Sequence, residues 1–151
     1  MGRGGGLLLL AVALLLVVRP LEAQVVLNEV LYDPEGADTG YEFVEVLNCG
    51  RLPVSLAGWV LETGNGASPD DWTVEWVGGD LDELGSGEFL LIGEDAVVPP
   101  PDVVTPLDLQ NGPDAARLRD GDAVVDVVGW GEPLFAGYCE GSPAVDVPGG
   151  C

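Results

Sequence analysis

Short apolar runs separated by turn residues dominate the chain after residue 24. Val25–Leu31 and Tyr41–Asn48 each read as a β-strand, and an acidic turn joins them. In the second strand Phe43, Glu45 and Leu47 are expected on one face and the residues between them on the other, because strand side chains alternate.

Further strands are predicted where apolar and polar residues alternate or where short apolar runs end in turns. They are expected at Gly58–Glu62, Trp72–Val77, Phe89–Ile92, Ala115–Arg119 and Ala123–Val128, with a short edge strand at Leu107–Leu109. The alternation places Trp72, Val74 and Trp76 on one face of their strand. An Asp-Gly turn at 120–121 favours a tight hairpin between the last two long strands.

The positions of the turn residues also predict the fold class. Three prolines at 99–101 exclude a central strand there, and no helical periodicity of useful length is seen after residue 24. Many short strands with Gly- and Pro-rich turns are typical of a β-sandwich or barrel. We therefore expect an all-β domain over residues 24–151.

Residues 1–23 have the pattern of a secretory signal. Arg3 precedes the apolar run Leu7–Val18, Pro20 breaks it, and small Ala23 stands before the expected cleavage site. This run is shorter than the roughly 20 residues that cross a bilayer, so no transmembrane segment is expected in the mature chain. We predict an exported protein that is secreted, periplasmic or at the cell surface. A retained membrane anchor or a misplaced start is the alternative.

The composition of charged residues excludes several classes of function. The chain has 26 acidic and 5 basic residues and no histidine, for a net charge of −21. Such a chain repels phosphate backbones, so nucleic acid is not an expected partner. The absence of histidine removes the commonest general base and imidazole ligand. No two acids are singled out as a catalytic pair, and we expect no enzymatic activity.

Several short motifs in a fixed order resemble one family. They comprise Asn28-Glu29, Glu42-Phe43-Val44-Glu45, Asn48, Leu56-Ala57-Gly58-Trp59, Leu61, Leu109, Asn111-Gly112, Leu118, Asp120-Gly121, Val125-Asp126 and Gly129. Together they resemble the lamin-tail domain in its bacterial exported type, over residues 25–135. The resemblance implies an immunoglobulin-like β-sandwich.

The end of the chain departs from that pattern. Family members usually continue with a further segment and a closing strand, whereas this sequence stops at Cys151. We expect an incomplete C-terminal end in which the last strand of the sandwich is missing. In an exported chain Cys139 and Cys151 are the cysteines that are easier to join, because they flank one Gly- and Pro-rich loop. The third, Cys49, leaves the count odd.

The first two predicted strands and their connecting loop concentrate acidic residues. Hard oxygen ligands with flexible geometry suit Ca²⁺. The candidate calcium ligands are Glu29, Asp33, Asp38, Glu42 and Glu45. A solvated acidic face with carboxylates that cap turn amides explains the same residues without any cofactor.

Three functions follow from these observations. The leading interpretation is an exported, non-catalytic module that makes protein or envelope contacts. The first alternative, which the resemblance implies, is an accessory domain, as a fragment, of a larger secreted hydrolase or nuclease. The second alternative is a calcium-dependent binding module.

Overall fold

The computed structural model describes residues 25–36 and 39–144, and every regular element in them is a β-strand. The strands are β1 (Val25–Leu31), β2 (Phe43–Asn48), β3 (Val54–Ser55), β4 (Trp59–Asn65), β5 (Trp72–Val77), β6 (Glu83–Leu84), β7 (Phe89–Gly93), β8 (Val103–Val104), β9 (Asp114–Asp120) and β10 (Ala123–Trp130). The all-β prediction is confirmed. Across the described ranges, no helix is long and apolar enough to span a membrane.

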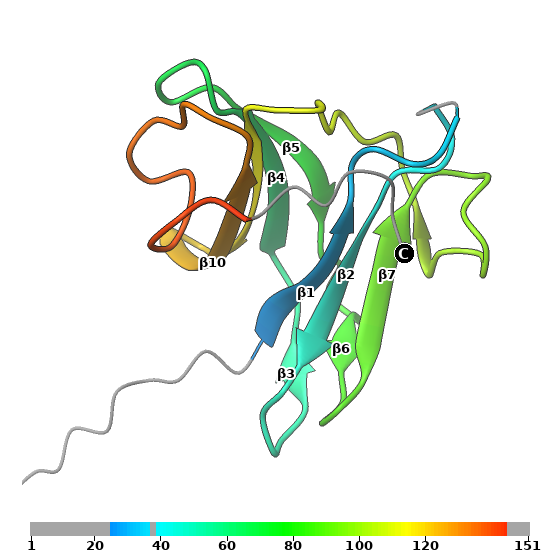
Figure 1. Ribbon diagram of the computed structural model, residues 1–151. Helices are drawn as coiled ribbons and strands as arrows, with labels where there is room; N and C mark the ends of the chain where they lie inside the picture. The colour runs from blue at the N-terminus through cyan, green and yellow to red at the C-terminus, as the bar shows by residue number, and fades with distance from the viewer. Residues whose placement is uncertain (1–24, 37–38, 145–151) are drawn as a thin grey trace, which may run out of the picture.

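The strands build a sandwich of two four-stranded sheets (Figure 1). The first sheet has the order β1-β2-β7-β8, the second has the order β10-β9-β4-β5, and β3 pairs with β6 at one end. The edges β1 and β10 lie beside each other. There the backbone N–H of Leu27 donates to Oδ2 of Asp126 at 2.8 Å, so a carboxylate links the two sheets on that side.

Apolar side chains from both sheets fill the space between them. The fully buried members of this core include Val25, Val44, Val46, Leu61, Ile92, Ala116, Leu118 and Trp130. Trp59 also lies in the core, with 7% of its surface exposed. Burial of this apolar area is the main favourable contribution to folding.

A β-bulge at Asn28 sets the register of β1. Leu27 pairs with Val46 and Glu29 pairs with Glu45, so Asn28 is the extra residue. Without that extra residue Val30 would turn away from the core and Glu29 would face into it.

A second bulge makes one prediction wrong. The register between β4 and β5 shifts after Leu61, so Trp76 is paired with Leu61 but Val74 with Glu62. Trp76 is consequently buried, whereas Val74 is 54% exposed on the opposite face. Trp72 also lies on that outer face, and the three residues do not share one side of the strand.

The expected edge strand at Leu107–Leu109 is also absent, since no strand lies there. Leu107 and Leu109 are nevertheless buried, with 9% and 4% exposed. They belong to the connection that crosses from the first sheet to the second, so their apolar spacing fills the core without forming a ladder. The other long strands match their predicted positions within a few residues, and the hairpin turn at 120–121 is confirmed.

Three predictions lie outside the described residues. They are the signal over residues 1–23, the ligand role of Asp38, and the closing pair Cys139 with Cys151, of which only Cys139 is described.

Candidate interaction surface

The outer face of the first sheet carries apolar side chains in rows across β1, β2 and β7. Pairing across the three strands gives one row of Val26, Leu47 and Phe89, and a second of Leu31 and Phe43 that ends at Gly93. Between them lies a row of Glu29, Glu45 and Leu91. We call this set of residues the outer face of the first sheet.

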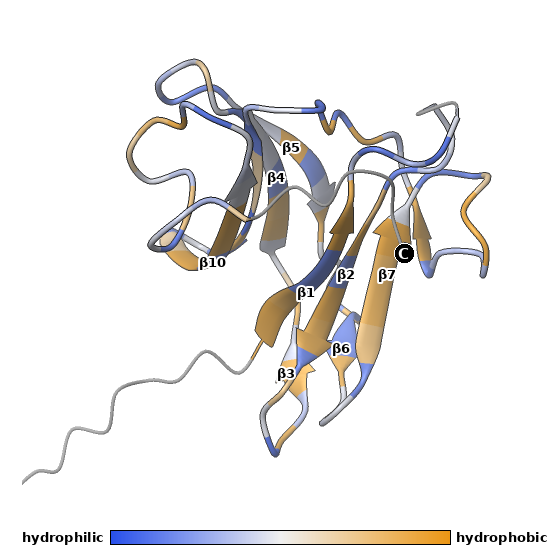
Figure 2. Ribbon diagram, in the orientation of Figure 1, coloured by the Kyte–Doolittle hydropathy of each residue, from blue (hydrophilic) through white to orange (hydrophobic). Residues whose placement is uncertain are grey.

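This outer face is accessible to solvent. Phe89 is 52% exposed, Val104 of the edge strand β8 is 62% exposed, and the other apolar members are half-buried. In Figure 2 the strand β7 is hydrophobic along nearly all of its length, while β1 and β2 each carry a hydrophilic band in the middle. The face therefore combines apolar contact area with a central acidic band, a composition suited to a binding surface.

A hollow of about 340 Å³ adjoins the row of Leu31 and Phe43. Its lining residues are Leu31, Pro34, Glu35, Tyr41, Phe43, Ala96, Val97 and Val98. Glu35 is the only ionisable carboxylate among them, and the remaining walls are mostly apolar. The hollow can thus take an aliphatic side chain that ends in a positive charge.

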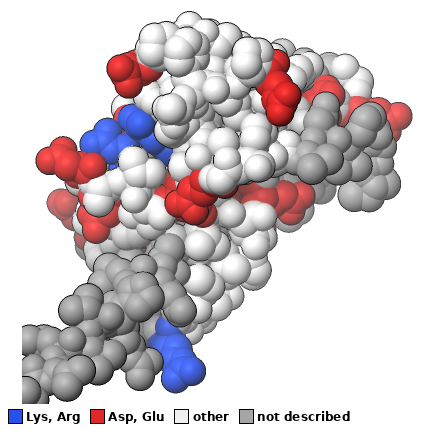
Figure 3. All heavy atoms as spheres, turned by 60° about the vertical axis from the view of Figure 1, so that its left-hand side comes forward, with Lys and Arg blue, Asp and Glu red and all other residues white. Residues whose placement is uncertain are grey.

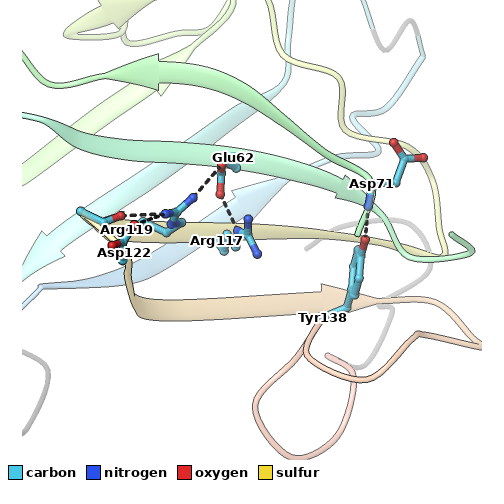
Figure 4. A network of polar contacts seen from close by, with 7 residues as sticks. Glu62, Asp71, Arg117, Arg119, Asp122 and Tyr138 are labelled. Atoms are coloured by element: carbon cyan, nitrogen blue, oxygen red, sulfur yellow. Dashed lines mark hydrogen bonds and ion pairs between the residues drawn. The ribbon is translucent and has the colours of Figure 1, made fainter. Parts of the chain in front are cut away.

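The outer face of the second sheet is different because the chain covers part of it with its own side chains. After β10 the chain turns back, and Tyr138, which is only 2% exposed, stacks on Trp72 with ring centroids 4.4 Å apart. Tyr138 also accepts a 2.9 Å hydrogen bond from the N–H of Asp71 (Figure 4). Gly129 permits this cover, since a Cβ there would lie 2.3 Å from the carbonyl oxygen of Tyr138.

Two arginines are also held on this covered face. Arg117 forms an ion pair with Glu62, and its guanidinium lies 3.9 Å from the ring centroid of Trp72. Arg119 reaches the other oxygen of Glu62 at 3.3 Å and Asp122 at 3.8 Å (Figure 4). In Figure 3 the upper basic area is bordered by acidic atoms. These two cations are neutralised within the protein, whereas the acids of the opposite face remain solvated.

A family model of the Lamin Tail Domain matches residues 20–132. The chain belongs to the lamin-tail domain family. The sandwich is accordingly immunoglobulin-like, as the sequence motifs led us to expect. Comparison with the curated proteins finds none that matches the chain.

Within this lamin-tail domain Glu42 has an architectural position. Its side chain points inward, only 6% of the residue is exposed, and Oε2 accepts a 3.2 Å hydrogen bond from the N–H of Leu109. The connection that crosses between the sheets is thereby fastened to β2. Asn48 works similarly at the other end of β2, where its buried amide donates to the carbonyls of Leu52 and Leu84 at 2.9 and 2.8 Å.

A second buried carboxylate holds the same crossing connection from β9. Asp114 is 1% exposed, its Oδ2 accepts a 2.8 Å hydrogen bond from the N–H of Gln110, and Oδ1 has no hydrogen-bond partner within the described residues. Burial raises the pKa of Asp114 to about 6, and the nearby charge of Asp108 adds to this effect. Trp130 donates to the carbonyl of Gln110 at 2.8 Å, so both residues fix one loop.

The structure divides the five candidate calcium ligands. Glu29 and Glu45 share the outer face, exposed Asp33 lies in the turn after β1, and Glu42 points into the core. Within residues 25–36 and 39–144 no group of three or more Cys, Asp or Glu side chains is placed to hold a metal ion. Calcium binding stays an untested alternative, and of the described candidates only Glu29 and Glu45 lie at directly paired positions.

Sequence reasoning did not single out the outer face of the first sheet as a site. The signal was nevertheless present, because β2 carries apolar residues on both of its faces. Val44 and Val46 face the core, while Phe43 and Leu47 face outward. In a sheet with only one face packed on the core, a strand that is apolar on both sides leaves apolar side chains exposed on the other face. Such exposed apolar area is typical of a binding surface.

Proposed function

We propose that the chain is an exported, non-catalytic lamin-tail module that makes protein contacts at the cell envelope or outside the cell. Its membership of the lamin-tail family supplies the module class. The observation that carries the binding role is the solvent-facing set of apolar rows on β1, β2 and β7 with its acidic centre. On the second sheet Tyr138 and Trp72 stack over part of the outer face, and its exposed valines lie on a face that also holds the paired Arg117 and Arg119.

The positions of the two buried acids support a non-catalytic role. A general acid or base must reach a substrate. Glu42 and Asp114 are 6% and 1% exposed and hold backbone amides of the connection between the sheets. Both carboxylates therefore stabilise the fold and are not positioned to reach a substrate.

The signal-like pattern of residues 1–23 supports export. An exported chain would lose its first 23 residues, and its new N-terminus would be Gln24. The strongly acidic composition fits a module that stays dissolved outside the cell and meets partners by surface complementarity.

Site-directed photo-crosslinking of the full chain in its native host tests this function. A photoreactive residue is placed in turn at Leu47 on the first sheet, at Val77 on the second, and at Leu81 in the loop after β5. We expect the chain in the exported fraction with Gln24 at its N-terminus, and specific adducts to an envelope or extracellular protein. A chain retained in the cytoplasm, or one without adducts at any of the three positions, would overturn the proposal.

A further inference from the structure

Resting on that function, we propose that the outer face of the first sheet docks a basic, apolar-bearing protein segment. Such a segment presents a Lys or Arg between two apolar side chains. The cation lies over Glu29 and Glu45, and the apolar groups lie on the rows of Leu47 with Phe89 and of Leu31 with Phe43.

The first argument is the arrangement of the rows. On β2 the outward residues Phe43, Glu45 and Leu47 follow one another at every second position. Same-face residues of a strand are roughly 6.6 Å apart, so the apolar, acidic and apolar rows repeat at that interval. Four residues of an α-helix, slightly more than one turn, rise about 6 Å. Side chains at i, i+4 and i+8 of a helix therefore match the three rows.

The second argument is the uncompensated charge. Glu29 and Glu45 occupy directly paired positions, where like charges destabilise a sheet. The contact that the structure gives Glu45 is a neutral one, the 2.7 Å hydrogen bond from the amide of Asn28. A cation from a partner would replace repulsion with attraction on two carboxylates at once.

The hollow beside the face adds a second cationic position. It adjoins Leu31 and Phe43, its walls are apolar, and Glu35 is its carboxylate. An Arg or Lys can bury its aliphatic stem there and keep its charged end near that acid. A partner with two basic residues would use both positions.

Charge argues against a second copy as the occupant. The chain carries a net charge of −21, and two such faces brought together would oppose Glu29 and Glu45 to their own copies. Like-charge juxtaposition across an interface suppresses that association. A cationic partner is attracted by the same groups.

Binding of a synthetic helical peptide of about 15 residues, with Leu, Arg and Leu at i, i+4 and i+8, tests the proposal by fluorescence anisotropy. The comparison peptide has the same composition in scrambled order. We expect the full chain to prefer the patterned peptide. The double variant Glu29→Gln, Glu45→Gln should weaken binding about tenfold, through the loss of two charge contacts.

The control variant Asp80→Asn, Glu83→Gln removes the same charge from two exposed positions outside the face. It should bind the patterned peptide nearly as wild type does. Equal binding of both peptides, or an equal loss in the control variant, would overturn the proposal. So would self-association in analytical ultracentrifugation that Leu47→Ser abolishes, because the occupant would then be a second copy.

The crosslinking experiment separates this inference from the proposed function. Adducts at Val77 or Leu81 without any at Leu47 would keep the exported binding module and refute the docking face. Failure at all three positions would refute the module itself.

Discussion

Glu29 of β1 and Glu45 of β2 stand opposite each other on the outer face of the first sheet. The pairing depends on the bulge at Asn28, which shifts the register by one residue. The same bulge frees the Asn28 amide to donate to Oε1 of Glu45 at 2.7 Å. A local irregularity thus keeps Val30 on the core and at the same time sets two like charges side by side.

Glu42 and Glu45 lie on the same stretch of chain but face opposite ways, so their truncation should have opposite effects. Glu42→Ala leaves the N–H of Leu109 without its buried acceptor, and we expect a loss of about 1–3 kcal/mol in the free energy of unfolding. Glu45→Ala removes a like-charge contact and should be neutral or slightly stabilising. Urea denaturation of both variants measures the difference, and equal losses would contradict the placement of Glu42.

Arg117 should matter far more for stability than the exposed Arg51. The substitution Arg117→Ala removes one of the two arginine contacts of buried Glu62 and also exposes the ring of Trp72. We therefore expect the free energy of unfolding to fall by about 2–4 kcal/mol. The matched control Arg51→Ala should change stability by less than about 0.5 kcal/mol. Thermal and urea unfolding check both variants. A small effect at Arg117 would show that the ion pair is solvated.

Asp114 should make the protein more stable in mild acid. Its folded pKa of about 6 lies above the ordinary aspartate pKa of 3.8, so the folded state binds the proton more tightly than the unfolded state does. This contribution is fully present below pH 3.8 and is lost as pH rises through 6. Glu75 acts in the same direction, since burial raises its pKa.

The variant Asp114→Asn isolates this group. Between pH 4 and pH 7.5 the wild type should lose about 2 kcal/mol more stability than the variant does. Urea denaturation at several pH values measures the two slopes. Parallel slopes would mean that Asp114 keeps an ordinary pKa in the folded protein.

Calcium should stabilise the protein no more than magnesium does. Glu42 faces the core, and of the described candidates Glu29 and Glu45 alone are directly paired, whereas Ca²⁺ takes about six to eight oxygens. We expect both ions to raise the melting temperature equally by screening repulsion, at fixed ionic strength. A rise specific to calcium and reversed by chelator would favour the calcium-dependent module and would place a ligand set beyond these two acids.

The alternation in β2 and the turn at 120–121 were predictable because they depend on residues next to each other in the chain. The two-sided position of Trp76 and Val74 was not, since it depends on a bulge set by pairing with β4. A strand period alone carries no signal for an inserted residue.

The burial of Glu42 and Asp114 could not be predicted from the sequence for a related reason. Glu42 meets Leu109 across 67 residues of sequence, and only the folded sandwich brings them together. In the sequence Glu42 is one of 26 acidic residues, and nothing there distinguishes it from Glu29 and Glu45. Burial separates them, because one side of β2 faces the core and the other faces solvent.

Amide chemical-shift mapping with the patterned basic peptide tests the docking face most directly. We predict shifts on β1, β2 and β7 of the first sheet, at Val26, Glu45 and Phe89, with little change at Trp72 and Arg117. Shifts that gather on the second sheet, or none at saturating peptide, would contradict a docking role for the outer face of the first sheet.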